Sequence, residues 1–225
     1  MTYADHLKSW AAVLVAMVAS LLLCTVAFTT GAEAQDDNCK GQVVLDAGHG
    51  GTDSGAVNTK YRLTEKEQTL IVANRTKALL EADHISVCMT RTSNSETLSN
   101  SDRYTYANTT GASMLVSVHM NGASSSTADY TTTLFGKWRK DKELATTVFN
   151  SLSTLPAADG KTKIATRTPY SFASGVLLKS NMPATIAETV FITNDQEAQL
   201  LANGTRQPQI AEALKVGIES YLTTH

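Results

Sequence analysis

The sequence predicts an α/β protein in which a single domain is built on a mostly parallel, twisted sheet flanked by helices. Short apolar runs alternate with segments of helical periodicity along most of the chain, as in proteins that wind a parallel sheet. Polar and glycine-rich segments follow several of the apolar runs, where such sheets place their ligand sites. No internal repeat or long linker separates a second domain. We therefore expect one domain with its functional site at strand ends.

Composition excludes several classes of protein. The 225 residues are 42% hydrophobic and 18% charged, which is not the composition of a disordered chain, a coiled coil or a polytopic membrane protein. Lys and Arg number 19 against 21 Asp and Glu, so the formal net charge is -2. Such a chain has no basic surface with which to hold nucleic acid or an anionic membrane. We expect no nucleic-acid partner.

Residues 1–34 have the pattern of an export signal. Lys8 precedes an apolar run over residues 10–28, and Ala32-Glu33-Ala34 is the small-x-small pattern that a signal peptidase cuts. Cleavage after Ala34 leaves residues 35–225 as the domain and predicts a location in the periplasm, the cell envelope or outside the cell. The run is about as long as the shortest bilayer-spanning helices, so an uncleaved anchor remains the alternative. Only that alternative predicts contact with a membrane.

Two cysteines remain after the predicted cleavage. Cys24 lies in the signal, whereas Cys39 and Cys88 stay in the domain as an even pair. Export places them in a compartment where thiols oxidise, so a Cys39–Cys88 disulfide is the prediction. Two separate thiols are the alternative, because a sequence does not give the distance between the two Cα atoms.

The elements follow one another in the order expected for such a sheet. An apolar run over residues 42–46, bounded by glycines, predicts a buried strand. A helical pattern opens at Thr64 and runs to about Ala82, and Thr64 with Glu67 fits a capping box. The other predicted elements are strands at 85–90, 114–119, 130–135, 176–178 and 185–188, and helices at 103–108, 142–152 and 209–222.

Three side chains at the predicted strand and helix ends form a candidate metal site. His49 follows the first strand among glycines, and His119 ends a later strand. Glu65 lies in the first turn of a helix and is left free if Glu67 caps the backbone. Two imidazoles and a carboxylate suit one Zn²⁺ per chain, with a fourth position open for water. The alternative is a loop residue at His49 and an ordinary hydrogen-bonded histidine at His119.

Glu188 is a further candidate for a functional residue, because a carboxylate at the end of an apolar strand is costly to bury without a partner or a role. One reading is a general base next to the metal site, with its pKa raised by loss of solvent. The other reading is a structural partner for a basic residue or a helix N-terminus. The residues alone leave both readings open.

Several motifs in fixed order resemble those of a known enzyme family. They are residues 44–56 (VLDAGHGGTDSGA), Glu65-Lys66 followed by Leu70, Thr90-Arg91, Arg103 with Ala107-Asn108, residues 117–121 (SVHMN) and residues 187–194 (AETVFITN). Together they cover nearly all of residues 43–222. The pattern resembles the zinc-dependent N-acetylmuramoyl-L-alanine amidases of peptidoglycan, of the Amidase_3 type.

The resemblance implies a role for each candidate residue. His49, Glu65 and His119 correspond to the zinc ligands, and Glu188 corresponds to the catalytic carboxylate. The implied reaction is hydrolysis of the amide between the lactyl group of MurNAc and L-Ala, with peptidoglycan or muropeptides as substrate. The implied fold is again a mostly parallel sheet flanked by helices. A monomer is expected.

Two positions qualify the resemblance. The family usually has Gly between the catalytic Glu and the Phe that follows it, whereas this chain has Thr189-Val190. The difference concerns the fine geometry of the site. Glu67 competes with Glu65 as the ligand, and the Glu-Lys dipeptide together with the capping argument favours Glu65.

Two other functions remain open at this stage. A zinc peptidase or carboxypeptidase that acts on stem peptides would use the same ligand set on another amide. A non-catalytic wall-binding protein is the alternative of a different class. It is disfavoured, because a binding module does not need two His and two Glu together at strand ends.

Overall fold

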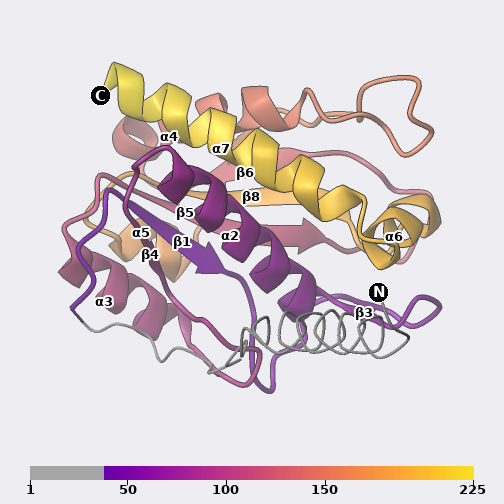
Figure 1. The fold of residues 1–225 in the computed structure, drawn as a ribbon, viewed down its shortest axis with the longest axis horizontal. Helices are drawn as coiled ribbons and strands as arrows, with labels where there is room; N and C mark the ends of the chain where they lie inside the picture. Colours follow the sequence, from indigo (N-terminus) through magenta and orange to yellow (C-terminus); the bar gives the residue numbers. More distant parts are fainter. Residues whose placement is uncertain (1–37) are drawn as a thin grey trace, which may run out of the picture. The chain divides into compact units, whose positions relative to one another are not determined.

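A six-stranded sheet forms the centre of the protein in the computed structural model, which describes residues 38–225 (Figure 1). The predicted export signal lies outside these residues. The strands, in spatial order, are β4 (Val87–Met89), β1 (Val43–Ala47), β5 (Met114–Asn121), β8 (Ala184–Phe191), β6 (Thr132–Phe135) and β7 (Tyr170–Ser171). The first four are parallel, whereas β6 is antiparallel to β8 and parallel to β7. The predicted mostly parallel sheet is confirmed.

Helices cover both faces of this sheet. One face is covered by α2 (Glu65–Ala82), α4 (Trp138–Leu152) and α7 (Arg206–Thr224), with α7 lying between the other two (Figure 1). The other face carries α3 (Asn100–Thr110) and α5 (Gly175–Lys179). A short antiparallel pair, β2 (Val57–Asn58) and β3 (Leu63–Thr64), leads into α2, and α6 (Asp195–Ala202) leads from β8 into α7.

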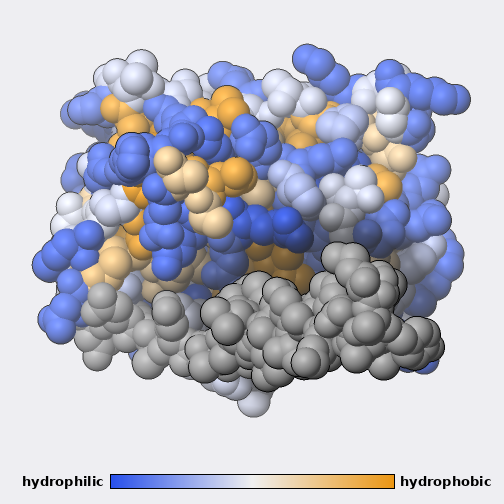
Figure 2. Space-filling model, viewed as in Figure 1, coloured by the Kyte–Doolittle hydropathy of each residue, from blue (hydrophilic) through white to orange (hydrophobic). Residues whose placement is uncertain are grey.

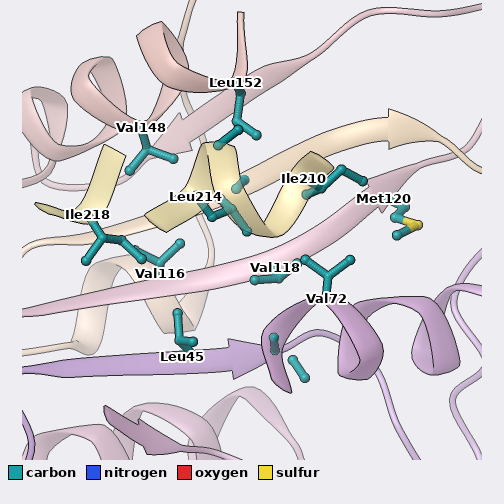
Figure 3. Packing of buried hydrophobic residues seen from close by; sticks show 14 of the residues in the cluster. Leu45, Val72, Val116, Val118, Met120, Val148, Leu152, Ile210, Leu214 and Ile218 are labelled. Atoms are coloured by element: carbon teal, nitrogen blue, oxygen red, sulfur yellow. The ribbon is translucent and has the colours of Figure 1, made fainter. Parts of the chain in front are cut away.

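Alternate side chains of each strand enter two separate cores. Leu45 in β1 belongs to the core under α2, α4 and α7, and its neighbour Val44 belongs to the core under α3 and α5. Ile210, Leu214 and Ile218 of α7 pack in the first of these cores (Figure 3). Because both faces are buried, the central strands carry apolar residues on both faces and show no regular polar alternation. This is the pattern that made them recognisable in the sequence.

Several predicted elements differ from the structure. Helices α3 and α4 begin three and four residues before their predicted starts, and β8 continues three residues beyond its predicted end. Residues 176–178, predicted as a strand, lie in the five-residue helix α5. A run of three apolar residues fits a buried strand and a buried helical turn equally well, and here Val176 and Leu177 are the residues that face the core. Helix α7 begins at Arg206, three residues before the predicted start, with Pro208 in its first turn. A proline is tolerated there because the first backbone N–H groups of a helix have no partner within it.

The predicted capping box at Thr64 and Glu67 is wrong. Thr64 is the N-cap residue of α2, but its side chain accepts no capping hydrogen bond. The start of α2 is instead fixed by β3, because the backbone N–H of Glu65 donates to the carbonyl of Ala56 at 2.8 Å. A capping box does occur at α3, where Ser99 and Asp102 bond each other's backbone. The argument that had left Glu65 free therefore fails, although Glu65 itself lies where it was expected.

The predicted disulfide is present. Cys39 and Cys88 are bonded, with their Cα atoms 5.9 Å apart. Cys88 belongs to β4, the strand at one edge of the sheet. The bond therefore joins the beginning of the described chain to the rim of the sheet.

The outer side of the helical layer is mostly hydrophilic. Figure 2 shows polar side chains over most of α2, α4 and α7, with hydrophobic residues scattered among them. Within residues 38–225, no helix combines the length and the apolar character that are needed to cross a bilayer.

Candidate metal centre and active site

His49 lies in the loop directly after β1, in an unusual backbone conformation. Its φ is 60°, in the left-handed region that residues other than glycine seldom occupy. Gly50 and Gly51 continue the turn with φ of 134° and 55°. Nη2 of Arg103 donates to the carbonyl of His49 at 2.7 Å, which helps to hold the turn. Strain of this kind is typical of functional sites, where the surrounding structure fixes it.

Two glycines let the candidate ligands approach one another. A Cβ atom at Gly48 would overlap the ring of His119. A Cβ atom at Gly55 would lie 2.6 Å from Oε2 of Glu65 and 2.7 Å from Cδ2 of His49. No other residue fits either position without moving a ligand.

The three predicted ligands meet at one point. Oε1 of Glu65 lies 3.1 Å from Nε2 of His49 and 3.1 Å from Nδ1 of His119. One ligand atom from each residue lies within 4.8 Å of the other two, and this is the one cluster of its kind within residues 38–225. Glu67, the rival ligand, is not part of it. The cluster brings together residues from the β1 loop, the first turn of α2 and the interior of β5.

Backbone N–H groups hold Glu65 in this position. Met120 donates to Oε1 and Ala56 donates to Oε2, both at 2.9 Å. The residue is only 3% exposed. Burial alone would raise the pKa of the carboxyl, but its hydrogen bonds and attraction to His119 and His49 outweigh burial and lower that pKa well below its usual range. Glu65 is therefore a fixed anion.

The donor set fits a zinc ion, and so do its two nitrogen–oxygen separations. Two imidazole nitrogens and one carboxylate oxygen are typical protein ligands of Zn²⁺. Two ligands of a tetrahedral zinc lie about 3.3 Å apart, given metal–ligand distances of about 2.0 Å. The two nitrogen–oxygen separations of 3.1 Å are close to that value.

Asp53 orients His49, a role that was not predicted. Its Oδ2 lies 2.8 Å from Nδ1 of His49, and its Oδ1 accepts from the backbone N–H of Gly55 at 3.0 Å. Nε2 of His49 is thereby left to face Glu65. A carboxylate on the second ring nitrogen is the usual partner of a metal-binding histidine. The available signal in the sequence was an aspartate four residues after His49 in the same glycine-rich loop.

Without a bound metal ion, both histidines bind protons more tightly than usual. Burial disfavours the charge on His49, but hydrogen bonds and attraction to Glu65 and Asp53 outweigh burial and raise its pKa to about 9. The pKa of His119 is also raised, since its bond to Glu65 and the nearby carboxylate of Glu188 outweigh burial. Protons and a metal ion compete for the same nitrogens.

Glu188 lies opposite His119 in the sheet. The two residues are register partners in β8 and β5 and line the same cleft. Within residues 38–225, no hydrogen bond or ion pair engages the Glu188 carboxylate, so a structural partnership finds no support there. Burial raises its pKa, with Glu65 adding to the effect and the two histidines opposing it. A free carboxylate that binds protons more readily than usual suits a general base.

The cleft that these residues share has a volume of about 500 Å³. It lies against the sheet face that carries α3 and α5. Its remaining wall residues include Leu98, Ser99 and Asn100 at the start of α3, and Tyr170, Phe172 and Val176 on the side of β7 and α5. A larger groove of about 740 Å³ between α4 and α7 contains Glu212 as its one titratable residue. The chemistry therefore belongs to the cleft.

A buried charged network supports the floor of the cleft. Asp46, at the end of β1, is fully buried and accepts from Nη1 of Arg103 at 2.7 Å. Ser117 and Thr90 donate their hydroxyls to the same carboxylate at 2.5 and 2.6 Å. Burial would raise the pKa of Asp46, but the guanidinium and these hydroxyls outweigh burial and lower it. The network ties β1 to β5, to α3 and to the segment after β4.

Thr189, the first residue of the Thr189-Val190 pair that departs from the pattern of the resemblance, forms a hydrogen bond next to the site. Its side chain is buried, and its hydroxyl donates to the carbonyl of His119 at 3.0 Å. Thr189 therefore links β8 to β5 next to the candidate ligands.

Comparisons with known proteins agree with this site. The family model described as N-acetylmuramoyl-L-alanine amidase (Amidase_3) matches residues 43–220. The amidase AmiC of Escherichia coli O6:H1 is 29% identical over 80% of this chain, and YqiI of Bacillus subtilis, an uncharacterized protein, is 33% identical over 90% of it. The chain covers 52% of AmiC and 96% of YqiI, so it spans about half the length of the former.

Solved structures show the same fold. An N-acetylmuramoyl-L-alanine amidase from Clostridium difficile 630 is 31% identical, with a TM-score of 0.73 over 84% of this chain and 98% of that one. The catalytic domain of CwlV from Bacillus (Paenibacillus) polymyxa var. colistinus is 28% identical, with a TM-score of 0.72 over 81% and 98% of the two chains. The family match spans the whole sheet, the three clustered ligands and Glu188. The chain belongs to the Amidase_3 family of N-acetylmuramoyl-L-alanine amidases.

Proposed function

We propose that this protein hydrolyses the amide between the MurNAc lactyl group and L-Ala in peptidoglycan or in muropeptides. One observation carries the proposal: the unpaired carboxylate of Glu188 shares one cleft with His49 and His119, which cluster with Glu65. Family membership supports the choice of amide. All four residues come from one chain, so a monomer suffices for the reaction.

His49, Glu65 and His119 are the residues that would hold a zinc ion, one per chain. When bound, such an ion lowers the pKa of water and stabilises negative charge on a carbonyl oxygen. Asp53 holds the ring of His49 through Nδ1, which leaves Nε2 free to bind the metal.

Glu188 moves the proton. Its carboxylate accepts a proton from the attacking water as the new C–O bond forms at the lactyl carbonyl carbon. It then returns that proton to the nitrogen of L-Ala as the C–N bond breaks. The products are a lactyl carboxylate on the glycan and a stem peptide with a free amino terminus, so the net reaction consumes one water.

The proposal includes export of the domain. Residues 1–34 would act as a signal cleaved after Ala34, and the domain would work in the periplasm, the cell envelope or outside the cell. The Cys39–Cys88 bond supports this location, because disulfides persist in oxidising compartments. Amino-terminal sequencing of the protein from its host should begin at Gln35. A chain that still begins at Met1 would instead indicate an uncleaved anchor.

Mass analysis of the products from soluble muropeptides tests the activity. An amidase releases an intact stem peptide that begins with L-Ala and leaves MurNAc with a free lactyl carboxylate. A zinc peptidase or carboxypeptidase would shorten the stem and leave the MurNAc–L-Ala bond intact. A wall-binding protein would release nothing. The Glu188→Gln variant, loaded with zinc, is the control against a contaminating hydrolase.

A further inference from the structure

An exposed arginine stands beside the cleft on the Glu188 side. The backbone N–H of Arg167 donates to the carbonyl of Thr131 at 3.0 Å. The hydroxyl of Thr131 in turn donates to the carbonyl of Glu188 at 3.3 Å. Only the backbone segment that contains Thr131 therefore lies between Arg167 and the proposed base, Glu188.

Two aromatic side chains hold the guanidinium of Arg167. It lies over the ring of Tyr170, 4.5 Å from the ring centroid, and Nη1 donates to the hydroxyl of Tyr130 at 3.4 Å. Tyr170 itself lines the cleft together with Glu188. A guanidinium stacked on a ring keeps its N–H edge available for a planar anion. The ring of Tyr170 therefore lies between the guanidinium of Arg167 and the cleft.

The charge of Arg167 is not neutralised by a carboxylate. Arg103 and Arg206 each form a buried ion pair, with Asp46 and Glu197 respectively. For Arg167, no carboxylate of residues 38–225 lies within ion-pair distance. Its two aromatic partners are neutral, so the guanidinium is free to bind an anion from outside the chain.

The negative charge in the cleft would be balanced by such a cation. Glu188 lines it without an ion-pair partner, whereas Asp53 pairs with His49 and the charge of Asp46 is compensated by Arg103. A negatively charged part of a substrate that approached Glu188 would be repelled unless a positive group lay next to it. The glycan of peptidoglycan is uncharged near the scissile amide, whereas the stem peptide carries a carboxylate on the residue after L-Ala unless that group is amidated.

We propose that Arg167, held by Tyr170 and Tyr130, binds the carboxylate of the second stem-peptide residue, on the leaving side of the scissile amide. This inference rests on the proposed function and adds a preference within it. Arginine suits the role because its fork matches both oxygens of a carboxylate. Arg167 is thus a specificity residue and takes no part in the proton transfer.

Two muropeptides that differ only at this carboxylate, free in one and amidated in the other, test the inference. The protein should favour the free acid by about tenfold in kcat/KM, mainly through KM, as expected for one charge-assisted contact. Arg167→Ala should abolish the preference by raising KM for the free acid only. Arg167→Lys should keep part of it. Arg75→Ala removes an exposed arginine from α2, on the opposite face of the sheet, and should change nothing.

A binding measurement separates this inference from the proposed function. Calorimetry on zinc-loaded Glu188→Gln protein should show the same tenfold preference in Kd, and the added Arg167→Ala change should remove it. If neither muropeptide is cleaved by the wild type, the proposed function fails, and the binding preference alone decides the role of Arg167. Equal binding of the two muropeptides, or a preference that survives Arg167→Ala, would overturn the inference.

Discussion

Glu65 joins four donors through a single buried carboxylate. Ring nitrogens of His49 and His119 lie 3.1 Å from its Oε1, and the N–H groups of Met120 and Ala56 bond its two oxygens at 2.9 Å. The residue therefore connects the β1 loop, the strand β5 and the start of α2. The ring nitrogens of His49 and His119 are therefore already positioned for a metal ion that displaces their protons.

Substitutions of Glu188 and Glu65 should differ in their effect on zinc binding. Glu188→Gln should retain one zinc per chain and lower kcat by at least about 100-fold, because general base catalysis contributes that much or more. Glu65→Gln should lose the metal as well as the activity. Zinc content by elemental analysis and turnover of a soluble muropeptide are the two measurements. Near wild-type turnover in Glu188→Gln would show that another group takes the proton.

Asp53 should act on metal affinity through His49. Its side chain is 63% exposed, so Asp53→Asn should leave the fold intact. The zinc affinity should fall by about 10- to 100-fold, since the amide is a weaker acceptor for the imidazole N–H. Competition with a chelating indicator measures the change. Asp159→Asn, at an exposed aspartate in another loop, is the matched control. Equal zinc affinities in the two variants would show that Asp53 does not orient His49.

At the scale of elements, the buried Asp46 network should set the response of the fold to acid. The lowered pKa of Asp46 means that its contribution to stability is complete above about pH 4 and is lost as the pH falls through the lower value of the folded state. Asp46→Asn leaves the buried guanidinium of Arg103 without its ion-pair partner and should lower the free energy of unfolding by about 3 kcal/mol at pH 7. The difference from wild type should shrink below pH 4.

Urea unfolding of the wild type and of Asp46→Asn at pH 7, 5 and 3.5 measures this effect. Asp195→Asn breaks an exposed ion pair with Lys60 and should cost less than about 1 kcal/mol at each pH. A difference between wild type and Asp46→Asn that stays constant down to pH 3.5 would show that Asp46 does not carry the acid response.

The elements differed in how well the sequence predicted them. The central strands β1 and β5 are buried on both faces, so each contains a run of consecutive apolar residues that a sequence shows directly. β8 is less clear in the sequence, because Thr185, Glu188 and Thr189 interrupt its apolar residues. Helix α5 is too short for its periodicity to be read, and α6 begins with three polar residues that gave no apolar pattern. Both ends of α2 were predicted correctly, but the capping box was not, because the start is held by the pairing of β2 with β3, which is not local.

The same distinction applies to the site. His49, Glu65, His119 and Glu188 could be proposed from residue type and position after or within strands, and the resemblance to the family assigned their roles. Asp53 and Arg167 were not predicted, because the contacts of Asp53 depend on the left-handed turn at His49 and those of Arg167 on the segment that runs beside β6. For Asp53, its position four residues after His49 was the available signal. Residue type and position predicted the candidate ligands, whereas loop conformation determines which residues support them.

For the whole molecule, the disulfide should contribute a measurable share of stability. Cys39 and Cys88 are 49 residues apart in sequence, so the bond restricts a long loop of the unfolded chain. Reduction should lower the free energy of unfolding by about 2–4 kcal/mol. A Cys39→Ser and Cys88→Ser double variant should match the reduced wild type and should not respond to reductant. Equal stability of oxidised and reduced wild type would contradict this.

The cleft is itself a property of the whole fold. It combines the β1 loop, the start of α3, the interior of β5 and β8, and the segment that includes β7. The reversal of β6 relative to β8 places the segment before β7 beside Glu188. A mostly parallel sheet with one reversed edge therefore supplies the candidate metal ligands and, on our proposal, the base and the substrate contact at one place.

Digestion of purified sacculi, with products identified by mass, tests the central claim most directly. The protein stripped of metal by a chelator should release nothing. Restoration of one zinc per chain should release stem peptides that begin with L-Ala, and zinc-loaded Glu188→Gln protein should release almost none. Release of the same peptides by metal-free protein, or none by the zinc-loaded wild type, would contradict the account.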